Sequence, residues 1–117
     1  MDWKYLYTSL DGRIGRGTFW IGVLVITALS IVMMLLDMML GTFNDEYGIG
    51  ALGGIFSLLA IYPAIALYAK RWHDRGKSGW WTLIVLVPVI GAIWFLIEQG
   101  FLRGDQGPNA YGPDPLA

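Results

Sequence analysis

Three long apolar stretches constrain what this chain of 117 residues can fold into. They cover residues 19–40, 50–69 and 80–102, and their only charged residues are Asp37 and Glu98. A helix of about 20 mostly apolar residues crosses the roughly 30 Å hydrocarbon core of a bilayer. Because lipid offers no partners to backbone amides, each stretch is predicted to be helical. The sequence therefore predicts an all-α integral membrane protein with three transmembrane helices.

The composition supports a membrane class. Hydrophobic residues make up 56% of the chain and charged residues only 15%, against about 25% charged in soluble domains. The helices of a soluble bundle would also show a polar face, which these stretches lack. A net charge of −1 indicates no general attraction to nucleic acid, and the absence of cysteine excludes disulfides. We predict one membrane domain over residues 1–117.

The basic residues are distributed unevenly between the loops. The loop 41–49 contains two acids and no Lys or Arg, whereas four basic residues lie in the loop 70–79. Lys4, Arg13 and Arg16 precede the first span. Cytoplasmic loops are enriched in Lys and Arg, so the N-terminus and the basic loop are predicted to be cytoplasmic and the acidic loop to lie outside.

Residues 1–18 are predicted to form a short interfacial helix followed by a turn. One helical face collects apolar side chains, those of Trp3, Leu6, Tyr7 and Leu10. Thr18 is predicted to cap the first span. Because that span is full length, it is expected to be a retained anchor and not a cleaved signal.

Small residues gather on one face of the second predicted span. They are Gly50, Gly53, Gly54, Ser57, Ala60 and Ala64. Such a face lets helix backbones approach closely in lipid. We favour contact within the monomer, with a homodimer face as the alternative.

The segment "KRWHDRGKSGWW", residues 70–81, holds the residues best suited to chemistry. A phosphate-binding loop would need glycine where the chain has Arg71. A zinc site needs several ligands, and His73 is the only histidine. A triad of Ser78, His73 and Asp74 would need side chains of adjacent residues to align, and no oxyanion hole is recognisable. No catalytic residue, metal or cofactor is therefore predicted.

The same segment is typical of a membrane edge. Tryptophans concentrate at headgroup level, and each Lys or Arg near an anionic surface contributes about 1 kcal/mol. Ser78 is predicted to cap the third span. The lone acid Asp74 is predicted to pair with a neighbouring base, one of Arg71, Arg75, Arg13 and Arg16.

Three motifs resemble the bacterial membrane proteins of the domain-of-unknown-function family 805. They are "GRIGRGTFW" at 12–20, "RWHDRGKSGWW" at 71–81 and "NAYGPDP" at 109–115. The chain departs mildly from the family pattern, with Lys70 for arginine and Trp72 for leucine. The resemblance implies a small multi-pass protein of the bacterial inner (plasma) membrane, and it implies no activity or cofactor.

Two sets of candidate site residues follow. The first is a cytoplasmic cluster for headgroups or a partner, made of Arg13, Arg16, Arg71, His73, Asp74, Arg75, Lys77, Trp80 and Trp81. The second is the tail motif, made of Asn109, Tyr111, Gly112, Pro113, Asp114 and Pro115. The favoured hypothesis is a scaffold or regulator that binds anionic lipid headgroups or a larger membrane protein, or pairs with itself. A transport component and a lipid-headgroup enzyme are the alternatives, and nucleic acid is not an expected partner.

Two paths remain open for the third stretch. A full crossing places the tail, residues 103–117, outside, with Asp37 and Glu98 near the outer edge and within reach of Arg103. Alternatively, Pro88 and Gly91 turn a hairpin that returns the tail to the cytoplasmic side, where Asp114 would meet a base, one of Arg13, Arg16 and Arg71. We favour the full crossing, because a hairpin turn exposes its backbone to lipid unless protein buries it.

Overall fold

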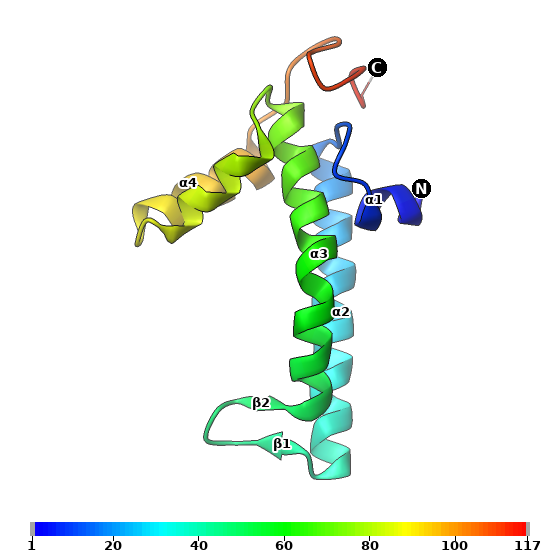
Figure 1. Cartoon of the computed structure of the whole chain (residues 1–117), viewed down its shortest axis with the longest axis vertical. Coiled ribbons are helices and arrows are strands. Elements are labelled where there is room, and N and C mark those ends of the chain that lie inside the picture. Colours follow the sequence, from blue (N-terminus) through cyan, green and yellow to red (C-terminus); the bar gives the residue numbers. More distant parts are fainter. Residues whose placement is uncertain (1, 117) are drawn as a thin grey trace.

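Two long antiparallel helices form the stem of the molecule, and the shorter helices gather at one end (Figure 1). The computed structural model describes residues 2–116, with principal extents of 51 × 33 × 19 Å. The stem consists of α2, Arg16–Leu40, and α3, Ala51–Asp74. At its far end, strands β1, Phe43–Asn44, and β2, Ile49–Gly50, pair antiparallel. The other end carries α1, Trp3–Thr8; η1, Gly79–Leu86; α4, Ile90–Leu96; and η2, Ile97–Phe101.

Within residues 2–116, α2 and α3 are the helices long and apolar enough to cross a membrane. Their 25 and 24 residues correspond to about 36 to 38 Å of helix. In the most apolar 18-residue segment of each helix, only 11% of the residues are buried inside the protein. The outward side chains are apolar, with Leu24 67% and Met39 81% exposed. An apolar outer surface of this kind is compatible with lipid. The structure confirms helices at two of the three predicted spans, those over residues 19–40 and 50–69.

The third apolar stretch differs from the prediction. It forms a hairpin of two short arms: η1 is a 3-10 helix, and α4 continues into the π-helix η2. The arms join through Val87, Pro88 and Val89, and Val89 has a φ of 63°. Gly91 lets the arms touch, since a Cβ there would lie 1.8 Å from the Ile84 carbonyl oxygen. The expected transmembrane helix over residues 80–102 is therefore wrong, and the alternative hairpin is the observed arrangement.

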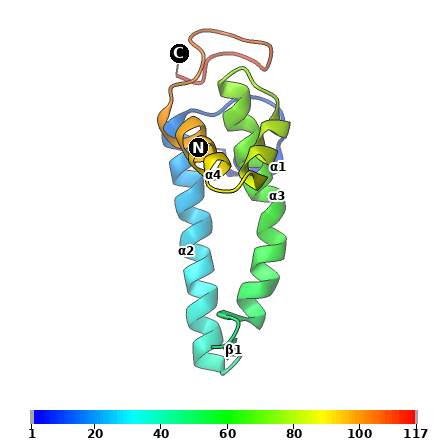
Figure 2. The same cartoon turned by 90° about the vertical axis from the view of Figure 1, so that its left-hand side faces the viewer.

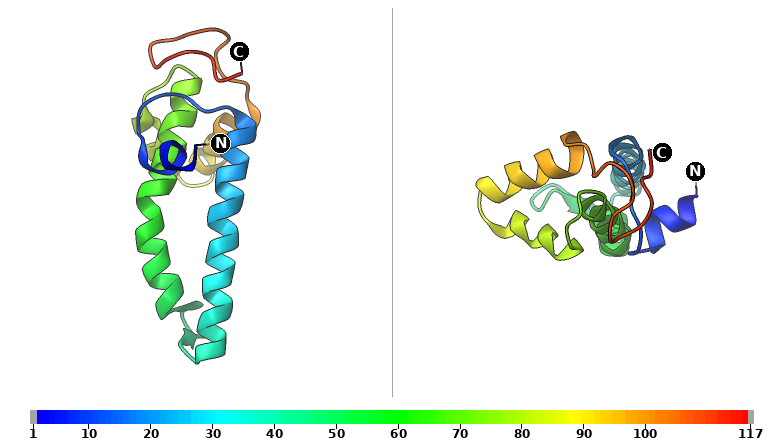
Figure 3. Two further views of the ribbon diagram at one scale, coloured as in Figure 1. Left: turned by 90° about the vertical axis from the view of Figure 1, so that its right-hand side faces the viewer. Right: turned by 90° about the horizontal axis from the view of Figure 1, so that it is seen from above.

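The hairpin returns the chain to the end of the stem where it started. The tail, described over residues 103–116, crosses over the ends of α2 and α3 (Figure 2). Seen from above, the hairpin and α1 leave the stem on opposite sides (Figure 3). The loop 70–79, the N-terminal segment and the tail thus lie together, at what we call the basic end of the stem.

Helix α1 forms as predicted but is shorter than the predicted face, and only part of that face is packed. Leu6 is buried and Tyr7 partly buried, whereas Trp3 is 48% exposed and Leu10, beyond the helix, is 41% exposed. Leu6 is 1% exposed and contacts the core residues Ile14, Phe19 and Leu67. The predicted cap of the first span is wrong, because α2 begins at Arg16 and Gly15 occupies the cap position. Without a side-chain cap, the first turn of α2 depends on packing against α1 and α3.

Asp37 joins the two stem helices at the end opposite the basic end. Its Oδ1 accepts the Thr42 hydroxyl at 2.6 Å and the Leu52 amide at 2.9 Å, and its Oδ2 accepts the Gly53 amide at 2.8 Å. The cap residue of α3 is Gly50, which has no side-chain oxygen. Asp37 therefore supplies the carboxylate that favours a helix N-terminus. The expected partner, Arg103, lies in the tail at the basic end.

Replacing Asp37 with alanine is expected to lower the midpoint of thermal unfolding in detergent by several degrees. The substitution leaves the amides of Leu52 and Gly53, in the first turn of α3, without this acceptor in a partly buried place. Asp45→Asn is the control, since Asp45 is an exposed acid in the loop 41–49, at the same end of the stem. Equal midpoints for the two variants would show that Asp37 does not hold the helices together.

Candidate functional site

Four charged side chains from the N-terminal segment and α3 are buried at the basic end of the stem, and a fifth, Glu98 of η2, is 6% exposed. Arg13 is 5% exposed, Lys70 and Arg71 are 0% exposed, and Asp74 is 2% exposed. Arg13 lies in the turn between α1 and α2, and the other three occupy the last turns of α3. We call these four residues the polar cluster. Buried charges are costly unless they are paired or fully hydrogen-bonded, so their partners define the site.

Asp74 pairs with two arginines from different parts of the chain. Its Oδ1 lies 3.0 Å from Nη2 of Arg13, and its Oδ2 lies 3.0 Å from Nη1 of Arg71. The predicted pairing of Asp74 with a neighbouring base is confirmed for these two candidates. Asp74 therefore joins the segment before α2 to the end of α3.

Arg13 holds the tail through backbone carbonyls. Its Nη1 donates to Gly107 at 2.7 Å and to Gly112 at 3.1 Å, and its Nη2 donates to Asp105 at 2.6 Å. Nε and Nη2 also bind Asp74. A guanidinium has five N–H donors, and Arg13 directs all of them to this chain. It is thus a structural clamp and not a free ligand for a phosphate.

Lys70 and Arg71 bind the carbonyl ends of two helices. Nζ of Lys70 donates to the carbonyls of Tyr5 at 2.9 Å and Leu6 at 2.8 Å, in α1. Nε of Arg71 donates to the carbonyl of Gln99 at 2.7 Å, in η2. Cations are favoured at helix C-termini. The sequence analysis did not predict this role of Lys70. The available signal was the position of Lys70 directly before the motif that begins at Arg71.

The tail motif packs against His73. The His73 and Tyr111 rings stack, with centroids 4.0 Å apart and an interplanar angle of 1°. Nδ2 of Asn109 donates to the His73 carbonyl at 2.9 Å, and Nδ1 of His73 lies 3.0 Å from the Gly12 carbonyl oxygen. Asp74 makes its contacts elsewhere, so His73 and Asp74 serve separate interactions.

Two further residues shape the docked tail. Gly104 permits close approach, since a Cβ there would lie 1.9 Å from Oδ2 of Asp74. Asp114 accepts the amides of Leu116 and Gly107, each at 2.9 Å, and these hydrogen bonds lower its pKa. In the hairpin alternative Asp114 was expected to meet an arginine; instead its hydrogen bonds fold the tail on itself. Pro113 and Pro115 flank it and are exposed.

The remaining predicted site residues lie at the surface, and we call them the exposed rim: Arg16, Arg75, Lys77, Trp80 and Trp81. Arg16 donates to the carbonyl of Phe101 at 2.8 Å. Glu98 binds Arg75 at 2.8 Å and Lys77 at 2.5 Å. The predicted place of Glu98 near Arg103 at the outer edge is therefore wrong. The structure thus divides the predicted cluster into a buried clamp and an accessible rim.

Comparisons with known proteins agree with a membrane protein. The family model described as "Protein of unknown function (DUF805)" matches residues 7–113. The "Inner membrane protein YhaH" of Escherichia coli (strain K12) is 38% identical over 98% of this chain and 97% of its own length. The "Inner membrane protein YhaI" of the same strain is 31% identical over 93% and 87%, respectively. No solved structure matches the chain.

Proposed function

Since this chain belongs to the DUF805 family of proteins of unknown function, we propose that it is a scaffold or regulator that binds anionic lipid headgroups of the inner membrane. The observation that carries this proposal is the exposed rim at the root of an apolar hairpin. Arg75 and Lys77 keep 25% and 29% of their side chains exposed, whereas Arg13 and Arg71 are consumed by internal contacts. We therefore expect the exposed rim, and not the polar cluster, to bind the headgroups.

The proposed orientation places both termini in the cytoplasm. Lys and Arg residues gather at the basic end, and the loop 41–49 carries acids only. The positive-inside tendency then assigns the basic end to the cytoplasmic side. The hairpin brings Arg103 and the tail to the same side, which strengthens the asymmetry.

The hairpin is proposed to lie in the inner leaflet. Away from its root, the hairpin exposes mostly apolar side chains, with Trp80 78%, Leu86 74% and Val89 71% accessible. Exposing such an apolar surface to water is unfavourable, whereas lipid acyl chains can cover it. Each arm is about 16 to 18 Å long, roughly half of the hydrocarbon core. The arms therefore reach one leaflet only.

The alternative functions draw less support. Transport needs a polar path at the midplane, and the hydroxyls of Ser30 and Ser57 bond to carbonyls of their own helices, at Ile26 and Gly53. A headgroup enzyme using His73 with Asp74 would need the two to cooperate, and they serve separate contacts. A larger membrane protein on the hairpin would be revealed by the experiment below.

Lipid analysis of the protein purified in mild detergent tests the proposal. Anionic phospholipids are expected to be enriched over their share in the source membrane, and the enrichment should fall when the basic residues of the exposed rim, Arg16, Arg75 and Lys77, are replaced by glutamine. Asp45→Asn is the control, because it alters charge at the opposite end. Copurified lipids that match the source membrane, or a stoichiometric protein partner in place of lipid, would contradict headgroup binding as the function.

A further inference from the structure

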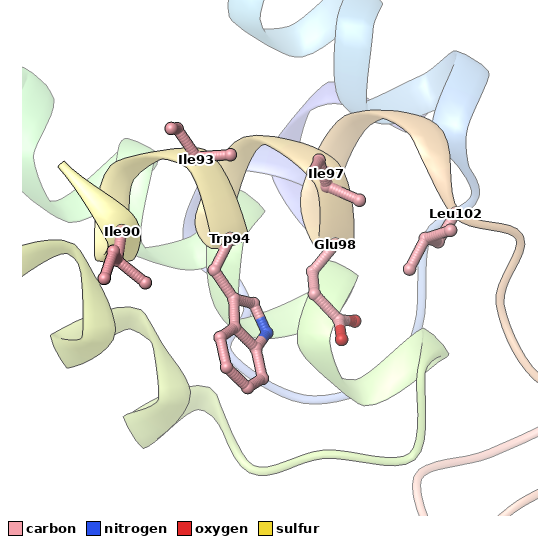
Figure 4. Close-up of a pocket in the computed structure, with 6 residues that line it drawn as sticks. All are labelled: Ile90, Ile93, Trp94, Ile97, Glu98 and Leu102. Atoms are coloured by element: carbon pink, nitrogen blue, oxygen red, sulfur yellow. The ribbon is translucent and has the colours of Figure 1, made fainter.

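Two apolar grooves lie along the arms of the hairpin, one on each arm. The first, of about 380 Å³, follows the α4–η2 arm (Figure 4) and is lined by Ile90, Ile93, Trp94, Ile97, Glu98 and Leu102. The second, of about 390 Å³, lies on η1 and is lined by Ser78, Trp80, Trp81 and Ile84. Trp81 of the second groove stacks on Trp94 of the first, with ring centroids 6.3 Å apart. The indole pair is therefore a wall common to both grooves.

A small charged group lies beside this wall. Nζ of Lys77 lies 2.5 Å from Oε1 of Glu98 and over the Trp81 ring, 5.6 Å from its centroid. Nε of Arg75 lies 2.8 Å from Oε2 of Glu98. In Figure 4, Trp94 and Glu98 project from the same side of their arm. The charged group therefore adjoins both grooves.

The charged group has hydrogen-bond donors to spare. Within residues 2–116, Arg75 donates through Nε to Glu98 and through Nη1 to the carbonyl of Arg103, which leaves its Nη2. Lys77 directs one of its three donors to Glu98. Two bases and one acid carry a net charge of +1 at neutral pH. One phosphodiester, with a charge of −1, would complement this group.

We propose that this site binds one phospholipid with two acyl chains and a net negative headgroup. Its phosphate accepts hydrogen bonds from Nη2 of Arg75 and Nζ of Lys77, and one acyl chain lies in each groove. A zwitterionic lipid is disfavoured, because its ammonium group would approach two cations while both oxygens of Glu98 are already engaged. The proposal deepens the proposed function and rests on it, since it specifies where and how many lipids bind.

Native mass spectrometry of the full-length protein with added phosphatidylglycerol or phosphatidylethanolamine tests the site. One phosphatidylglycerol is expected to remain bound at fixed stoichiometry, with weaker binding of phosphatidylethanolamine. Lys77→Met should weaken phosphatidylglycerol binding about tenfold, by loss of a charge-assisted hydrogen bond. Lys4→Met is the matched control, because Lys4 is an exposed base on α1, across the stem from the hairpin.

A second variant tests the site independently in case Lys77→Met disturbs folding. Ile84→Trp fills the groove on η1, leaves the charged group intact and should also weaken binding, whereas Leu58→Trp on the exposed face of α3 should not. Anionic enrichment without fixed stoichiometry, or equal losses in Lys77→Met and Lys4→Met, would overturn this site and leave the proposed function standing. Absence of any anionic preference would overturn both.

Discussion

Replacing Asp74 with alanine is expected to lower the free energy of unfolding in detergent by about 3–5 kcal/mol, the cost of breaking a buried ion pair from one side. The side chains of Arg13 and Arg71 are 1% and 0% exposed, and Asp74 is the carboxylate that faces both. Without it, two guanidinium groups lose their shared counter-charge where water cannot replace it. Chemical denaturation followed by circular dichroism measures the change.

Asp11→Asn is the matched control for this prediction. Asp11 is an exposed acid near the same end of the stem, and exposed charges contribute little to stability. If the Asp74→Ala and Asp11→Asn variants unfold at the same denaturant concentration, the polar cluster is not a main source of stability at this end.

Replacing Arg13 with lysine is expected to release the tail while keeping the charge. A lysine presents its donors from one nitrogen, so it cannot span Asp74 and the three tail carbonyls that the guanidinium binds together. Each hydrogen bond to a charged group is worth about 1.5–3 kcal/mol, so losing two of them raises the open population of the tail well beyond tenfold. Trypsin cleavage after Arg103 measures that opening.

Arg16→Lys provides the comparison for the cleavage rates. Arg16 is exposed and donates to a single carbonyl, that of Phe101. Its replacement should change cleavage little. A variant with lysine at position 13 that is cleaved no faster than one with lysine at position 16 would show that the tail is held by other contacts.

Much of the fold could be predicted from local patterns. The lengths of the apolar stretches predict α2 and α3, the spacing around Leu6 predicts α1, and the single acid among several bases predicts an ion pair at Asp74. These features depend on neighbours in sequence. The proposed orientation also follows from loop charges alone, and it awaits the labelling experiment described below.

The hairpin could not be chosen from the sequence, because its length and composition fit a crossing helix equally well. Pro88 and Gly91 allow a turn, but the path is selected by contacts distant in sequence. Arg71 binds the carbonyl of Gln99, 28 residues later, and Arg13 binds that of Gly107, 94 residues later. Contacts between residues so far apart leave no periodic pattern in the sequence. For the same reason, Arg13 and Arg71 were placed in a cluster for headgroups or a partner, although Asp74 and backbone carbonyls satisfy them.

Thiol labelling of intact cells tests most directly the central claim that the chain crosses the membrane twice and returns its tail to the basic end. The chain has no cysteine, so single cysteines can be placed at the exposed positions Asp45 and Ala110. An impermeant maleimide should label the cysteine at position 45 in intact cells, and the one at position 110 only after the membrane is permeabilised. Labelling of position 110 in intact cells would contradict the account, because the tail would then lie outside, beyond a third crossing.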